Sequence, residues 1–80
     1  MNAAQCKMAR AALGLGVRDL AALAEVAQAT VSRLERGEEL KSSTILVIRA
    51  ALETAGVQFI EENGGGAGVR LKRKEDGKSG

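Results

Sequence analysis

The chain contains no histidine, no proline, no tryptophan and no tyrosine, and it has one cysteine and one phenylalanine among 80 residues. Histidine is the commonest general base and metal ligand, so its absence argues against a zinc site or a nucleophile with a base. The single cysteine, Cys6, cannot form an internal disulfide, and we expect it to be a small core residue. The sequence therefore predicts a non-enzyme without metal or cofactor, in the reducing cytoplasm.

Long apolar runs and a strong charge of one sign are also missing. No segment approaches membrane-spanning length, and the N-terminus lacks a signal-peptide pattern, so we expect no membrane association. The net charge of +2, from twelve Lys and Arg against ten Asp and Glu, does not by itself indicate a polyanion ligand. The basic residues are nevertheless clustered. One group is Arg33, Arg36 and Lys41, and a second is Arg70, Lys72, Arg73 and Lys74.

Alanine and aliphatic residues dominate, and their spacing predicts four helices in one small domain. The first covers residues 3–13 and ends at Gly14. The second follows Gly16 and runs for about two turns. The third ends at Gly37, where a C-terminal glycine belongs. The fourth, "TILVIRAALETAG", ends at Gly56, and Ser42 or Ser43 is available as its N-cap.

The pattern changes after the fourth helix. In "VQFIEENGGGAGVRLKRK" apolar and polar residues alternate on both sides of a glycine-rich turn, which predicts a β-hairpin, a frayed tail being the alternative. The expected fold is therefore mainly α, with a four-helix domain over residues 1–56. A hairpin follows over residues 57–74, and residues 75–80 form a disordered tail.

The second and third predicted helices are joined by three residues, with the small Ala21 where the two must approach closely. This arrangement is typical of a helix-turn-helix. The inner face would bury Leu20, Ala24, Val26, Val31 and Leu34. The outer face would carry Gln28, Ala29, Ser32, Arg33 and Arg36.

Residues 3–56 resemble the DNA-binding domain of the Cro and phage-repressor (Xre) family. The matching pattern is "RDLAALAEVAQATVSRLERG", and Arg10 and Leu52 also agree with it. The resemblance implies a repressor-like helix-turn-helix protein that binds double-stranded DNA as a homodimer on an inverted repeat. It also implies that Arg10 pairs with Glu35 and so ties the first helix to the end of the third.

Two positions depart from the family pattern. Val17 stands where relatives often have a glutamine or serine, and it cannot make the backbone phosphate contact of a glutamine. Glu25 stands where a glycine is common, so it requires a left-handed backbone or a slightly different turn.

The third helix supplies the candidate DNA contacts, a solvated polar surface being the alternative. Gln28 can read adenine and Arg33 can read guanine, each through a bidentate contact. Ala29 and the methyl group of Thr30 can touch a thymine methyl, and Ser32 faces outward beside them. By the resemblance, the phosphate contacts are Thr30, Arg36, Lys41 and Ser43.

Two roles are open for the hairpin. Its apolar face and unpaired edge could pair with a second copy to form the dimer. The residues expected at such an interface are Val57, Phe59, Ile60, Val69 and Leu71. Alternatively, the basic residues near the end could form an arm that lies on DNA.

The sequence thus favours a sequence-specific transcriptional regulator, either a repressor or an autoregulatory switch. The alternative is an antitoxin or another protein-interaction module on the same scaffold, with a protein partner that the sequence does not identify. A toxin-like neighbouring reading frame would favour the second, and inverted repeats upstream of the gene would favour the first.

Overall fold

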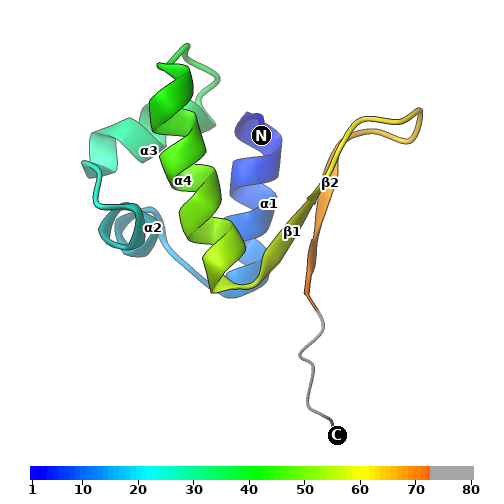
Figure 1. The fold of residues 1–80 in the computed structure, drawn as a ribbon. Coiled ribbons are helices and arrows are strands. Elements are labelled where there is room, and N and C mark those ends of the chain that lie inside the picture. Colours follow the sequence, from blue (N-terminus) through cyan, green and yellow to red (C-terminus); the bar gives the residue numbers. More distant parts are fainter. Residues whose placement is uncertain (73–80) are drawn as a thin grey trace, which may run out of the picture.

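The computed structural model describes residues 1–72. It contains four helices and a two-stranded antiparallel hairpin, as the sequence predicts (Figure 1). The elements are α1 (Ala3–Leu13), α2 (Val17–Ala24), α3 (Gln28–Glu35), α4 (Ser42–Ala55), β1 (Val57–Ile60) and β2 (Gly68–Leu71). None of the helices in residues 1–72 has the length and apolar character needed to cross a membrane. Arg73 and Lys74, and the tail expected over residues 75–80, lie outside the described residues.

The ends of α1 are set by local hydrogen bonds. The Asn2 side chain accepts from the Gln5 N–H at 2.8 Å, and the Gln5 side chain accepts from the Asn2 N–H at 3.0 Å. This reciprocal pair satisfies two N–H groups that a helix start leaves free. At the other end Gly14 takes the left-handed conformation, with φ 71°. The helix therefore has the bounds that the sequence predicts.

The turn between α2 and α3 contains the strained residue that the sequence indicates. Glu25 has φ 59° and ψ 45°, a left-handed conformation that is unfavourable for a residue with a Cβ. It allows the Val26 N–H to donate to the Ala21 carbonyl at 3.0 Å and so closes the end of α2. Ala21 is buried, as expected where the two helices approach.

The start of α4 differs from the prediction. The helix begins at Ser42, and Lys41 is its N-cap, so neither Ser42 nor Ser43 caps it. The reason is that the Lys41 carbonyl already accepts the N–H groups of Thr44 and Ile45, at 3.0 and 3.1 Å. Within residues 1–72, no side chain forms a capping hydrogen bond at this helix start.

The core lies between the helices and extends under the hairpin. Its largest fully buried side chains are Leu20, Ile48, Leu52, Val31, Val57 and Cys6. Phe59 pairs with Val69 in the hairpin, and the Arg49 guanidinium lies 5.1 Å from the centre of its ring. The Gln5 amide donates to the carbonyls of Ile60 and Gly68, both at 3.1 Å. These contacts make the hairpin a packed part of the helical body.

Candidate nucleic-acid interface

The outward face of α3 carries the predicted contact residues. Gln28, Ala29, Arg33 and Arg36 are exposed, whereas Thr30 and Ser32 are half-buried. Val31 and Leu34 lie on the opposite face and are buried in the core. The helix therefore presents polar side chains to solvent, while its opposite face is packed against the core.

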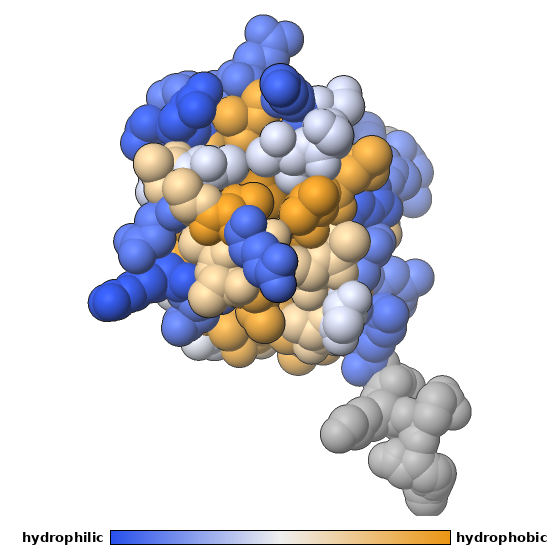
Figure 2. All heavy atoms as spheres, turned by 60° about the vertical axis from the view of Figure 1, so that its left-hand side comes forward, coloured by the Kyte–Doolittle hydropathy of each residue, from blue (hydrophilic) through white to orange (hydrophobic). Residues whose placement is uncertain are grey.

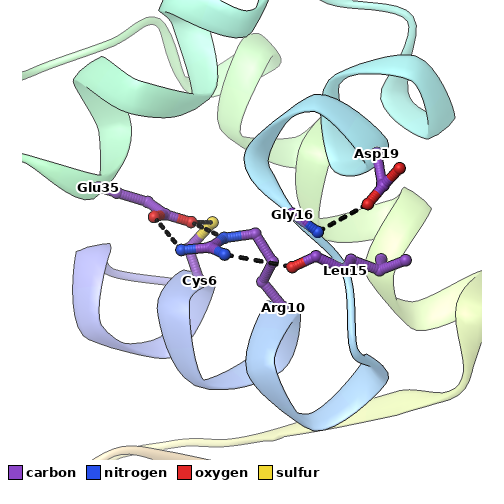
Figure 3. Close-up of polar contacts among 6 residues, drawn as sticks. All are labelled: Cys6, Arg10, Leu15, Gly16, Asp19 and Glu35. Carbon is purple, nitrogen blue, oxygen red and sulfur yellow. Dashed lines mark hydrogen bonds and ion pairs between the residues drawn. The ribbon is translucent and has the colours of Figure 1, made fainter.

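The Arg10 and Glu35 pair that the resemblance implies is present in the structure (Figure 3). Arg10 Nε and Nη2 donate to the two carboxylate oxygens of Glu35, both at 2.9 Å. Arg10 Nη1 also donates to the Leu15 carbonyl at 3.2 Å, so one side chain joins α1, the loop before α2 and the end of α3. The Glu35 side chain is 9% exposed, which makes this bidentate pair a nearly buried one.

Cys6 belongs to the same cluster, which the sequence did not indicate. Its Sγ lies 3.3 Å from Glu35 Oε2 and donates to it. Burial, followed by the hydrogen bond to Glu35, raises the pKa of the Cys6 thiol to about 12. The cysteine is therefore an unreactive core residue.

The Glu35 carboxylate remains ionised at neutral pH. Burial by itself would raise the pKa of Glu35, but hydrogen bonds from Arg10 and Cys6 outweigh burial and lower it. The same hydrogen bond to Glu35 raises the pKa of Arg10. The cluster therefore fixes α3 through a charge pair that persists near pH 7.

A groove lies between α3 and the start of α4, with a volume of about 530 Å³. It is lined by Val26, Ala27, Thr30, Arg33, Glu39, Leu40, Lys41 and Thr44. Three predicted DNA contacts thus meet at one groove: Thr30, Arg33 and Lys41. Ser43 is exposed in the first turn of α4 but does not line it.

Glu38 is a further charged residue of this face, and sequence reasoning missed it. Its carboxylate accepts from Arg33 Nε at 3.0 Å and from Arg36 Nε and Nη2 at 3.1 and 2.9 Å. Hydrogen bonds from Arg33 and then Arg36 lower the pKa of Glu38. The available signal was Gly37, because a left-handed glycine after a helix turns the next residue back across the last turn.

The start of α2 carries a carboxylate against its first backbone N–H group. The Gly16 N–H donates to the Asp19 carboxylate at 2.8 Å. Val17 is half-buried and packs against the core. Any phosphate contact at this helix start would have to compete with the Asp19 carboxylate.

The residues expected at a dimer interface differ in their exposure. Val57 and Phe59 are 0% and 8% exposed, because α1 and α4 of the same chain cover them. These two side chains are therefore buried by the chain's own fold. Ile60 and Val69 are half-buried, and Leu71 is 52% exposed.

Exposed aliphatic side chains also occur on α2 and α4, where the sequence analysis singled out no surface. We call this the α2/α4 apolar face. Its members are Leu23, Leu46 and Val47, which are 53%, 62% and 47% exposed. Figure 2, which brings forward the α2 and α3 side of the molecule, shows apolar residues from the middle of that view to its lower edge, with hydrophilic ones above, on both sides and across the centre.

Comparisons with protein-family models and with curated proteins found no match to this chain.

Proposed function

We propose that this chain is a sequence-specific DNA-binding regulator of the Cro and phage-repressor type, which acts in the cytoplasm as a repressor or autoregulatory switch. The observation that carries the proposal is the way α3 is held against the rest of the domain. The Arg10 and Glu35 pair fixes one side of it, while Gln28, Ala29 and Arg33 remain exposed on the other. A helix that enters a DNA groove must be held rigidly on the face toward its own domain and must carry polar side chains on the face toward the DNA.

In this proposal the start of α3 reads bases. Gln28 pairs with an adenine, and Arg33 pairs with a guanine through its guanidinium. Ala29 and Ser32 lie on the same outward face and complete the surface toward the base edges. These contacts specify sequence, whereas phosphate contacts set register.

The phosphate contacts come from the groove side of the helix pair. Lys41 and Thr30 line the groove, and Arg36 and Ser43 are exposed beside it. The uncapped start of α4 adds N–H groups that favour an anion. The start of α2, occupied by Asp19, contributes less than in relatives with a glutamine there.

The expected assembly is a homodimer on an inverted repeat, because one recognition helix reads only a few base pairs. Two observations favour pairing through β2. The hairpin forms a two-stranded sheet, so among residues 1–72 each strand has one edge without a strand partner. Leu71 also remains exposed on β2. An unpaired edge with an apolar side chain favours strand addition.

A second candidate function is a protein-interaction module, such as an antitoxin. The α2/α4 apolar face favours it, because Leu46 and Val47 are left in solvent by the chain's own fold. A regulator that also binds a protein partner would use this face while α3 contacts DNA.

Selection of bound sequences from a random duplex pool at stated salt tests the DNA-binding function. We expect an enriched inverted repeat with half-sites about one helical turn apart. The R33A variant should weaken binding to that site by about 1–3 kcal/mol and relax the preference at one base position. R18A, which removes an exposed arginine of α2, is the control. A pool without enrichment would reject the proposal.

Light scattering on two lysine variants locates the dimer interface. L71K places a charge on the edge of β2, whereas L46K places one on the α2/α4 apolar face, and both positions are exposed. We expect L71K to be monomeric and L46K dimeric, because a lysine on an edge strand opposes pairing. A dimeric L71K with a monomeric L46K would instead place the interface on α4.

A further inference from the structure

We propose that Glu38 is a positioning residue for base recognition, which holds Arg33 in the orientation needed to read guanine. This inference rests on the proposed function and names a determinant of its specificity. It starts from the ion-pair cluster of Arg33, Arg36 and Glu38 at the end of α3.

The backbone places Glu38 next to both arginines. Gly37 has φ 86°, and the Glu38 N–H donates to the Arg33 carbonyl at 3.0 Å while the Gly37 N–H donates to the Leu34 carbonyl at 3.0 Å. This paired hydrogen bonding is the Schellman motif, which turns the chain back over the last helical turn. The carboxylate of Glu38 is thus held near the outer face of α3 by the main chain.

The atoms used in the cluster differ between the two arginines. Arg33 uses only its Nε toward Glu38, so within residues 1–72 its two terminal nitrogens have no hydrogen-bond partner. Arg36 uses both Nε and Nη2 on the same carboxylate. A guanidinium held at Nε keeps a planar pair of terminal nitrogens for the O6 and N7 atoms of guanine.

The negative charge of Glu38 also acts against non-specific binding. Arg33, Arg36 and Glu38 are all exposed, and in the proposed function this end of α3 faces the DNA backbone. A carboxylate there repels phosphates of any sequence. Its hydrogen bond to Arg33 favours binding only where a guanine lies opposite the oriented guanidinium. Glu38 would therefore increase the difference in affinity between specific and other sequences.

The test uses the selected site, a site changed at the base position that R33A relaxes, and a scrambled duplex. E38Q and E39Q remove the same charge from neighbouring exposed positions. Within residues 1–72, the Glu38 carboxylate hydrogen-bonds Arg33 and that of Glu39 does not. Both variants should bind the scrambled duplex roughly threefold more tightly. Only E38Q should lose base discrimination at the Arg33 position, by roughly fivefold or more, and E38D should restore part of it.

A second measurement follows the hydrogen bond between Arg33 Nε and Glu38 in the absence of DNA. The Arg33 Nε–H resonance should be protected from solvent exchange in the wild-type chain and in E39Q, and should lose protection in E38Q. Unchanged discrimination in E38Q, or an equal loss in E39Q, would overturn the role of Glu38 while the DNA-binding function stands. If selection with the wild-type chain enriches no sequence, the proposed function fails, and the role of Glu38 fails with it.

Discussion

At the scale of single residues, the charge pair of Arg10 and Glu35 joins α1 to the end of α3. Glu35 lies at the last residue of α3, and its 9% exposure means that the carboxylate has lost most of its water. The two hydrogen bonds from Arg10 and the one from Cys6 replace that water. Such a pair adds little net stability over apolar packing. Removing only one partner, however, lowers the stability strongly, because the other charge stays buried without compensation.

The R10M variant should therefore lose stability in a pH-dependent way. At pH 7 it leaves a buried Glu35 charge without its main partner, and we expect a loss of about 3 kcal/mol. Without Arg10, burial raises the pKa of Glu35 above its ordinary value of 4.5. Glu35 then takes up a proton as the pH falls toward 4.5, so the penalty should shrink. In the wild-type chain the pKa is lowered, so the stabilisation is present above pH 4.5 and is lost below it.

Urea denaturation at pH 7 and pH 4.5 checks this expectation. R18M, at an exposed arginine, should differ little from wild type at either pH. An R10M penalty of the same size at both pH values would show that the lost contact is packing and not the charge pair.

At the scale of secondary-structure elements, the turns decide how α3 is presented. Gly14 and Gly37 adopt left-handed conformations at no steric cost, whereas Glu25 adopts one with a side chain. The strain at Glu25 is tolerated because the Val26 N–H and the Glu25 N–H both find carbonyl partners at the end of α2. The turn therefore keeps a left-handed residue at this position without a glycine.

Replacing this residue by glycine should stabilise the protein. E25G removes the Cβ from a left-handed position, and we expect a gain of about 1 kcal/mol, which corresponds to a rise in Tm of roughly 4–8 °C for a domain of this size. E25A keeps a Cβ and should give no comparable gain. Thermal unfolding followed by circular dichroism measures both, and an E25A as stable as E25G would attribute the gain to the lost charge.

At the scale of the whole molecule, the hairpin completes the core of the helical domain. Val57 is fully buried and Phe59 nearly so, with Arg49 of α4 over the ring of Phe59. The Gln5 amide connects α1 to both strands through the carbonyls of Ile60 and Gly68. The helices and the hairpin therefore share one hydrophobic core.

A chain that ends at Gly56 should consequently fail to fold stably. It loses the burial of Val57 and Phe59, worth about 3–6 kcal/mol together, which is comparable to the whole stability of a small domain. A chain that ends at Lys72 retains every core residue of the described part and should unfold cooperatively. Circular dichroism during heating compares the two. A cooperative transition in the shorter chain at the same temperature would show that the helices fold stably without the hairpin.

The sequence by itself determined the four helices, the hairpin and most helix ends. Helical spacing depends on local geometry, and Gly14, Gly37 and Gly56 end their helices by conformational freedom that other residues lack. The outward position of Gln28 and Arg33 follows from the same periodicity once Val31 and Leu34 are assigned to the core. The Arg10 and Glu35 contact was implied by family resemblance and not by spacing.

Only the tertiary structure decided which long-range partners these residues meet. Cys6 with Glu35, and Gln5 with the hairpin carbonyls, join positions far apart in the chain, which no local periodicity encodes. The burial of Phe59 against the chain's own helices likewise depends on how the hairpin docks, since an alternating strand pattern shows that one face needs cover but not which surface covers it. The contact between Glu38 and Arg33 likewise depends on the turn at Gly37, which brings the Glu38 carboxylate back to the end of α3.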